Sequence, residues 1–279
     1  MNYFAGVDIG STMTKVVIMS DRLEASLIGP TGPEHRKLAN KVMEEALTRA
    51  GLCFDDLNYI VATGYGRINV PFADKQVTEI TCHAKGLQSL LPTVRTVIDI
   101  GGQDSKGIKI KAGKVTDFVM NDKCAAGTGR FLEVIADALG VALKDLGGLS
   151  LQAKNIIAIS NTCTVFAEHE IISQLAGGAP MNDLIAGIHD AVATRVYSMV
   201  KKLKVEKDVA VTGGGAKNIG LVKALENKFG FSLLVPPEPL ITGALGAALV
   251  GKEIYKKALA NGQEIERSSQ GLTEATFFT

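Results

Sequence analysis

The sequence contains 279 residues, of which 46% are hydrophobic, and its formal net charge is +1. A chain of this size can bury one large or two medium-sized cores, and its near-neutral charge argues against nucleic acid or an anionic membrane surface as a partner. It has no apolar run of membrane-spanning length and no basic segment followed by an apolar one at its start, so we expect a cytoplasmic protein.

The first third of the chain predicts strands and helices in alternation. Helical spacing of apolar residues predicts one helix at 34–50, with Gly51 as its stop, and a second at 77–91, closed by Pro92. The strands predicted around them are 3–10, 14–20, 24–29 and 58–64.

The pattern restarts at residue 95, since 95–122 again predicts three strands joined by tight polar turns. Further strands are predicted at 155–160, 208–215 and 231–235. Two helices are predicted to begin at Gly127 and just after Cys163. Three further helices are predicted at 183–203, 218–229 and 243–257. Alternation of this kind indicates an α/β fold.

The restart suggests two similar subdomains. Asp8 in "VDIGSTMTK" and Asp99 in "IDIGGQDSK" are 91 positions apart, and each ends a predicted buried strand that turns back into another. No linker rich in proline, serine or charge separates the halves, so we expect them to be packed and hinged. The predicted division is 1–95 and 96–242 for the subdomains, 243–260 for a helix packing back on the first, and 261–279 for a polar tail.

Three glycine-containing turns are candidate nucleotide-binding sites. Glycine lets the backbone approach a phosphate, and successive N–H groups can hold the phosphate oxygens. The residues of the first turn are Gly10, Ser11, Thr12, Met13, Thr14 and Lys15, and those of the second are Gly101, Gly102 and Gln103. The third turn, expected at the nucleoside end, supplies Gly213, Gly214, Gly215, Lys217 and Asn218. Asp8 and Asp99 would hold a hydrated Mg²⁺.

Each of these turns alone is compatible with an ordinary tight turn, and Lys217 and Asn218 with a surface charge and a helix cap. No G-x-G-x-x-G sequence opens a helix after the first strand, and no Walker-A sequence is present, so neither of those nucleotide sites is expected. Gln103 and Asp104 are the candidate catalytic residues that position or deprotonate an attacking water. The alternative for Asp104 is that it only caps its turn.

Four cysteines in a reducing compartment indicate core thiols, metal ligands or a nucleophile rather than disulfides. Cys124 and Cys163 each precede a predicted helix, where the helix dipole and free N–H groups stabilise a thiolate. Their spacing alone leaves metal ligation and inert thiols open. Cys53 and Cys82 are interpreted as inert.

The ordered set "DIGSTMTK", "IDIGGQD", "TGGGAKN" and "GALGAAL" resembles the superfamily of acetate and sugar kinases, Hsp70 and actin. That resemblance implies an α/β fold of two ribonuclease-H-like subdomains with ATP in the cleft between them. More narrowly, "ATGYGR", "MNDKCAAGTGRF" and "NTCTVFAE" resemble the activator ATPases of 2-hydroxyacyl-CoA dehydratases, of the BadF/BadG/BcrA/BcrD type. Benzoyl-CoA reductase ATPase subunits and the reductases of double-cubane proteins are related, and the similarity covers roughly residues 4–255.

The narrower resemblance implies an oxygen-sensitive homodimer with a single [4Fe–4S] cluster. Such a cluster needs four thiolates, which two copies of Cys124 and Cys163 would supply. The cofactors implied are ATP or ADP with Mg²⁺. The implied activity is ATP hydrolysis coupled to delivery of one electron to a partner iron–sulfur enzyme, with ferredoxin or flavodoxin as the electron donor.

Two other functions compete with this one. A sugar- or acetate-type kinase would use Asp99 or Asp104 as general base on a substrate hydroxyl, and an actin-like protein would be an ATP-regulated filament. Only the activator requires both Cys124 and Cys163 at helix starts, so the cysteine pair discriminates between the three.

Overall fold

The computed structural model describes residues 1–268 and 270–272, and the part of the predicted polar tail at 269 and 273–279 lies outside the described residues. The chain divides into two compact units. Unit 1 comprises Met1–Pro92 with the segment from Leu240 onward, and unit 2 comprises Thr93–Pro239. Among the described helices, none combines the length and the hydropathy that crossing a membrane requires.

Unit 1 is built on a five-stranded sheet in the order β3-β2-β1-β4-β5. The strands are β1 (Tyr3–Ile9), β2 (Met13–Met19), β3 (Leu23–Pro30), β4 (Leu57–Thr63) and β5 (Lys75–Gln76). The pairs β1–β2 and β2–β3 are antiparallel, whereas β4 runs parallel to β1. Every residue of β1 after Tyr3 is buried, as expected for a central strand covered on both faces.

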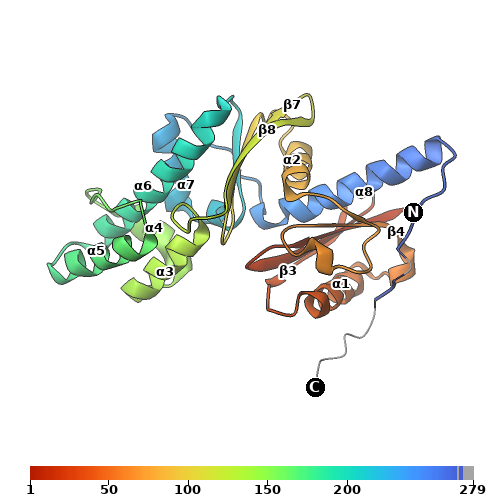
Figure 1. Cartoon of the computed structure of the whole chain (residues 1–279), viewed down its shortest axis with the longest axis horizontal. Coiled ribbons are helices and arrows are strands. Elements are labelled where there is room, and N and C mark those ends of the chain that lie inside the picture. Colours follow the sequence, from red (N-terminus) through yellow and green to blue (C-terminus); the bar gives the residue numbers. More distant parts are fainter. Residues whose placement is uncertain (269, 273–279) are drawn as a thin grey trace, which may run out of the picture. The chain divides into compact units, whose positions relative to one another are not determined.

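Helices cover both faces of this sheet (Figure 1). One face packs against α1 (His35–Ala50), and the other packs against α2 (Glu79–Leu90) and α8 (Thr242–Ala260). The helices α2 and α8 approach closely because glycines lie at their contact: a Cβ at Gly86 would collide with the carbonyl of Thr242, and a Cβ at Gly246 with that of Cys82. Short 3-10 turns lie at Phe54–Asp56, Arg67–Asn69 and Pro239–Ile241.

Unit 2 repeats the antiparallel hairpin in a four-stranded sheet ordered β8-β7-β6-β9. The strands are β6 (Thr96–Ile100), β7 (Ser105–Lys111), β8 (Lys114–Asn121) and β9 (Val209–Thr212). One face of the sheet packs on helices that Figure 1 shows gathered together. They are α3 (Gly129–Leu139), α4 (Leu146–Ser150), α5 (Thr164–Ala176), α6 (Met181–Val200) and α7 (Ile219–Phe229). Shorter 3-10 turns are Leu143–Asp145, Lys201–Leu203 and Gly214–Lys217.

The segment after α8 returns to the sheet of unit 1 and is fixed there by Asp74. The Oδ1 atom of this carboxylate accepts hydrogen bonds from Arg267 Nε at 2.9 Å and from the Ser268 N–H at 2.7 Å. Its Oδ2 atom accepts from the Ile60 N–H in β4 at 2.7 Å. Because the Asp74 side chain is only 1% exposed, these donors offset the cost of burying its charge.

Two predicted strands differ from the structure. The extended segment 155–160 has no sheet partner within the described residues: it runs along α6, with the Ile157 N–H bonded to Asp183 O and its carbonyl packed against Gly187. The predicted strand 231–235 is reduced to one bridge between Leu234 and Ala210. Alternating burial in the first segment mimics a strand, because an extended chain lying on a helix also buries every second side chain.

Candidate functional site

The two hairpins place the same residue types in the same register. Asp8 on β1 lies opposite Lys15 on β2, and Asp99 on β6 lies opposite Lys106 on β7. Each turn is closed by one backbone bond, from the Gly10 N–H to Met13 O at 3.1 Å and from the Gly101 N–H to Asp104 O at 2.9 Å. Both strand-end aspartates are 3% exposed.

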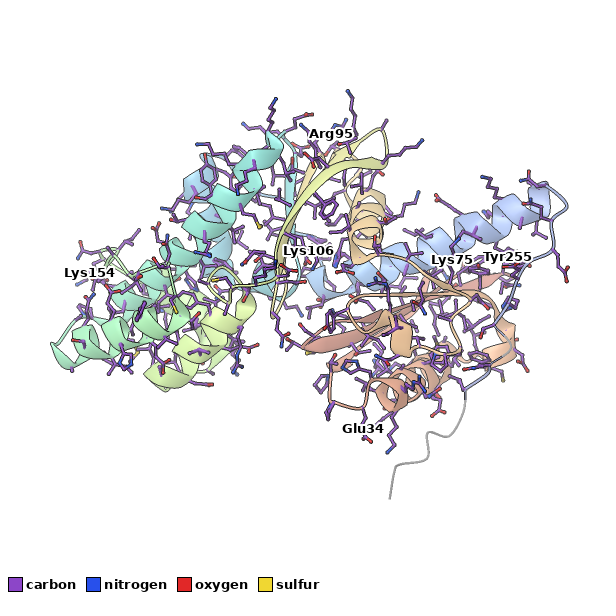
Figure 2. All side chains as sticks on the ribbon, viewed as in Figure 1. Glu34, Lys75, Arg95, Lys106, Lys154 and Tyr255 are labelled. Atoms are coloured by element: carbon purple, nitrogen blue, oxygen red, sulfur yellow. The ribbon has the colours of Figure 1, made fainter. Side chains whose placement is uncertain are left out.

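A lysine neutralises the buried aspartate in each hairpin. Lys15 Nζ lies 3.2 Å from Asp8 Oδ2, and Lys106 Nζ lies 3.3 Å from Asp99 Oδ2. Lys106, labelled in Figure 2, also lies 2.7 Å from Asp104 Oδ2. Lys106 is not among the residues predicted from the sequence, although it follows Lys15 by the same 91 positions that separate the two aspartates.

Glycines after the neighbouring parallel strands make room for these carboxylates. Gly64 follows β4 with φ +85°, and Gly213 follows β9 with φ +78°. A Cβ at Gly64 would collide with Asp8 Oδ1, and one at Gly213 would lie 2.5 Å from Asp99 Oδ1. Each unit therefore contains one copy of the same arrangement, a buried Asp–Lys pair whose carboxylate packs against a glycine with positive φ.

The turn residues differ in how accessible they are. In the first turn Thr12 is exposed and Ser11 is half-buried, whereas the buried Thr14 hydroxyl lies 2.8 Å from that of Thr31. In the second turn Gln103 is exposed and the Asp104 side chain is 30% exposed. Thr14 is thus occupied by a protein partner, while the other hydroxyls of the first turn and both candidate catalytic side chains can meet solvent.

The third turn uses its side chains for internal contacts. Asn218 caps α7 by accepting the Leu221 N–H at 3.0 Å, and its Nδ2 lies 2.9 Å from His189 Nε2. Lys217 pairs with Glu238 at 3.0 Å. Burial lowers the pKa of His189 to about 4, so the imidazole is neutral at pH 7 and accepts the Asn218 hydrogen bond. The backbone of Gly213–Gly215 is the part of this turn suited to contact a ligand.

Cys124 lies in a loop that is fastened to the second hairpin. Asn121 Nδ2, at the end of β8, donates to Cys124 O at 2.9 Å and to Ala126 O at 3.3 Å. The Ser105 hydroxyl at the start of β7 donates to Gly127 O. Cys124 lies five residues before the first residue of α3, so it is further from a helix N-terminus than the sequence predicts.

Cys163 is the N-cap residue of α5, so it lies directly before this helix as the sequence predicts. Its loop is fixed by Glu170, which accepts the Ser160 N–H at 2.9 Å, and by Arg195 on α6, whose Nη1 donates to Asn161 O at 3.1 Å. Both Cys124 and Cys163 are partly exposed.

The other two thiols have different surroundings. Cys82 on α2 is fully buried, and burial raises the pKa of its thiol to about 12, so it stays protonated at neutral pH. Cys53 is exposed beside α1 in unit 1. Within the described residues, no three His, Cys, Asp or Glu side chains come together as a metal-binding group. One copy of this chain therefore presents two accessible thiols in unit 2, each in its own anchored loop.

Comparison with known proteins identifies the family. The model of the BadF/BadG/BcrA/BcrD ATPase family matches residues 5–251. The chain belongs to this family. As a BadF/BadG/BcrA/BcrD ATPase it hydrolyses ATP, so the repeated Asp–Lys hairpins belong to an ATPase.

Several curated relatives are similar over nearly their whole length. The chain is 46% identical to the 2-hydroxyisocaproyl-CoA dehydratase activator of Clostridioides difficile, covering 92% of this chain and 97% of the relative. It is also 46% identical to the (R)-2-hydroxyglutaryl-CoA dehydratase activating ATPase of Acidaminococcus fermentans, over 92% and 98% of the two chains. Identity to one of the subunits of benzoyl-CoA reductase from Thauera aromatica is 34%, over 95% and 98%.

Solved structures confirm the fold predicted from the sequence. The C. difficile activator, solved with bound ADPNP, matches with a TM-score of 0.88 and 44% identity, over 94% of this chain and 99% of that one. A glucokinase of the ROK family from Streptomyces griseus matches with a TM-score of 0.57 at 14% identity, over 90% and 99% of the chains, which shows a shared fold alone. The relatives that are 46% identical are named as dehydratase activators, so the kinase alternative is not favoured.

Proposed function

We propose that this ATPase is a homodimeric activator that delivers a low-potential electron to a partner iron–sulfur enzyme. The observation that carries the proposal is the pair of partly exposed thiols in loops anchored within the unit that holds the second Asp–Lys hairpin. Relatives that are 46% identical are named as activators of 2-hydroxyacyl-CoA dehydratases, which supports a partner of that class or a related reductase or double-cubane protein.

The proposed nucleotide roles follow from accessibility and charge. Lys15 and the backbone of Ser11 and Thr12 hold phosphate oxygens at the first turn, and the backbone of Gly102 does so at the second, while the Gly10 and Gly101 N–H groups close these turns. The backbone of Gly213–Gly215 contacts the nucleoside end. Asp8 and Asp99 are the carboxylates proposed to act on a hydrated Mg²⁺ through water, because Mg²⁺ keeps several of its waters and needs few carboxylates.

Asp104 is the proposed residue that orients the attacking water. Its Oδ2 atom lies 2.7 Å from the Lys106 ammonium, and its side chain keeps enough exposure to reach solvent. A carboxylate paired in this way is fixed in direction, which water positioning requires. Gln103 lies exposed beside it and is the second candidate.

The thiols fit an iron–sulfur cluster only if two copies contribute. A [4Fe–4S] cluster takes four thiolates, and the described part of one chain offers Cys124 and Cys163 in accessible positions. When bound, such a cluster would store and release the electron. The chain's own contribution is to fix the two thiol loops, to place Cys163 at the N-terminus of α5, and to bury Cys82 so that it cannot act as a ligand.

An apolar surface beside Cys163 supports association with another protein surface. On α5, Val165, Phe166 and Ile172 are 55%, 66% and 46% exposed. A helix face this apolar is costly to leave in water and is typical of an interface. A second copy would cover it and bring the second pair of thiols.

The proposal is tested by purifying the protein without oxygen and measuring iron, sulfide and mass. We expect about four irons per dimer, a brown chromophore that air bleaches, and its loss in Cys124→Ser and Cys163→Ser. Cys53→Ser is the matched control and should keep the full iron content. Iron-free wild-type protein, a monomer, or a full cluster in either ligand variant would overturn the assignment.

The partner enzyme and the electron donor are tested with the same anaerobically purified protein. Reduced ferredoxin or flavodoxin should reduce the wild-type dimer, and the dimer should then activate a 2-hydroxyacyl-CoA dehydratase only when ATP is hydrolysed. Activation with a non-hydrolysable ATP analogue alone would contradict the coupling.

A further inference from the structure

The second phosphate turn, the Cys124 loop and the Cys163 loop are joined by a continuous set of contacts within unit 2. We propose that Ser105 and Arg195 are positioning residues, through which nucleotide at the β6–β7 turn controls the exposure of both thiols. The inference rests on the proposed function only for assigning phosphate to that turn. It holds for the protein's thiols whether or not a cluster is bound.

The first step runs from the turn to the Cys124 loop through the backbone. The N–H groups of Gly129 and Arg130, at the start of α3, donate to the carbonyls of Gly101 and Gly102 at 2.8 and 2.7 Å. These carbonyls belong to the same turn that is proposed to hold phosphate. A shift of the turn therefore pulls directly on the residues that follow the Cys124 loop.

Ser105 provides the second connection between the turn and this loop. Its side chain is fully buried one residue after Asp104, and its hydroxyl donates to Gly127 O. Asn121 holds the other side of the same loop through Cys124 O and Ala126 O. The loop is therefore hydrogen-bonded on one side to β7 and on the other to β8, and these two strands fix its position.

Arg195 joins the two cysteine loops. Gly127 has φ +94°, and a Cβ built on it would lie 3.2 Å from Arg195 Cγ, so the arginine stem packs directly under the Cys124 loop. The guanidinium of the same side chain donates to Asn161 O, two residues before Cys163. One side chain on a 20-residue helix thus contacts both loops, and neither contact is local in sequence.

Control of the thiols by nucleotide should change their alkylation rates, which can be followed without iron. In cluster-free protein, we expect Mg-ADP or a non-hydrolysable ATP analogue to change the iodoacetamide rate of Cys124 and Cys163 by about five-fold or more, which is the lower range of measured couplings. Mass spectrometry follows each cysteine separately. The exposed Cys53 is an internal reference and should react at one rate throughout, and the buried Cys82 should not react.

Two variants test which cysteine each connection reaches. Arg195→Met should leave the nucleotide response of Cys124 and reduce that of Cys163 to less than about two-fold, a loss of most of the coupling. Ser105→Ala should weaken both responses. Arg195→Gln, which keeps a stem under Gly127 and lacks the guanidinium, is a second test of the same link should the methionine variant misfold.

Lys228→Met is the matched control, because Lys228 also binds α6, at Asp190, away from the Arg195 contacts. It should retain both responses. A thermal shift with ADP verifies that each variant still binds nucleotide. Absence of any nucleotide response in wild-type protein, or a full Cys163 response in a folded Arg195 variant, would overturn the inference, whereas missing iron alone would overturn only the proposed function.

Discussion

At the scale of single residues, the Asp–Lys clusters at the two hairpin turns differ in one charge. Lys15 meets one carboxylate, whereas Lys106 meets Asp99 and Asp104, and Met13 occupies in the first turn the place of Asp104 in the second. The second turn thus has two carboxylates around one ammonium, where the first has one. That asymmetry favours phosphate binding by the side chain of Lys15 at the first turn, and water or cation positioning by the side chains of the second turn, whose phosphate contact is proposed for its backbone.

Removing the Lys106 charge tests this division. Lys106→Met should lower ATP turnover, and it should lower the free energy of unfolding by about 3 kcal/mol, because Asp99 is buried and loses a cation partner. Urea titration and steady-state ATP hydrolysis measure both effects. Lys109→Met on the same strand, whose partner Glu206 is exposed, should change neither; equal losses in the two variants would argue against a special role of Lys106.

His189 should give the protein an acid-sensitive stability. Burial lowers the pKa of His189 to about 4 from 6.5, so between these values the unfolded chain binds a proton that the folded chain does not. Stability should therefore fall by up to about 3 kcal/mol as the pH drops from 6.5 to about 4.

His189→Gln keeps a hydrogen-bond acceptor for Asn218. In this variant the urea midpoint of unfolding should depend less on pH between 6.5 and about 4 than it does in the wild type. His169→Gln, which alters an exposed ring on α5, is the control. An unchanged slope in His189→Gln would show that another group causes the acid sensitivity.

Residues that follow a buried strand were predictable, and residues that act across long separations were not. Asp8 and Asp99 end apolar runs and precede glycine, so their position was visible in the sequence. Arg195 is one arginine in a long helix, and its contacts are 34 residues away at Asn161 and 68 away at Gly127. No local pattern carries that information, since it arises from packing.

At the scale of elements, hairpins and long helices were predicted more reliably than isolated strands. The two hairpins and α1, α2, α6, α7 and α8 lie where periodicity and stop signals placed them. The segment 155–160 was predicted as a strand because a short apolar run, here Ile156–Ile159, indicates burial and not whether a partner strand is present. Asp183 on α6 supplies the partner instead, by accepting the N–H groups of Lys154 and Asn155.

Asp183 should therefore anchor this segment in a pH-dependent way. Burial opposes its charge, but the hydrogen bonds from Lys154 and Asn155 outweigh this and lower its pKa below 3.8. Its stabilisation should be complete above pH 3.8 and be lost as the pH falls through the folded value.

Asp183→Asn should be less stable than wild type at pH 7, and the difference should narrow below pH 3.8. Urea midpoints at both pH values measure it. Asp190→Asn, another acidic residue on α6, is the control. A difference between Asp183→Asn and wild type that is independent of pH would mean that the carboxylate's charge is not what holds the segment.

At the scale of the whole molecule, the same β-hairpin occurs twice in the chain. The repeat was predictable because Asp8, Gly10 and Lys15 recur 91 positions later as Asp99, Gly101 and Lys106. The boundaries of the units depend on where α8 packs, which is a tertiary contact. The thiol loops were recognisable only through family resemblance. Their anchoring by Ser105, Asn121 and Arg195 became visible only in the fold.

Nucleotide should stabilise the folded chain. Mg-ADP at about 100 times its dissociation constant should add about 2.7 kcal/mol to the free energy of unfolding, which a thermal shift detects. Lys15→Met should lose most of this gain, because it removes the lysine that pairs with Asp8 at the first turn. Lys37→Met, on α1, is the control and should retain it. An undiminished shift in Lys15→Met would remove Lys15 from the phosphate site.

The Asp74 carboxylate has a practical bearing on how the protein can be shortened. Trimming the chain at Ala260, where α8 ends, would delete Arg267 and Ser268 and leave a buried anion inside unit 1 that has lost two of its hydrogen-bond donors and keeps the Ile60 N–H. Versions intended for crystallisation should accordingly retain at least Ser268, although the residues from 261 onward look dispensable in the sequence.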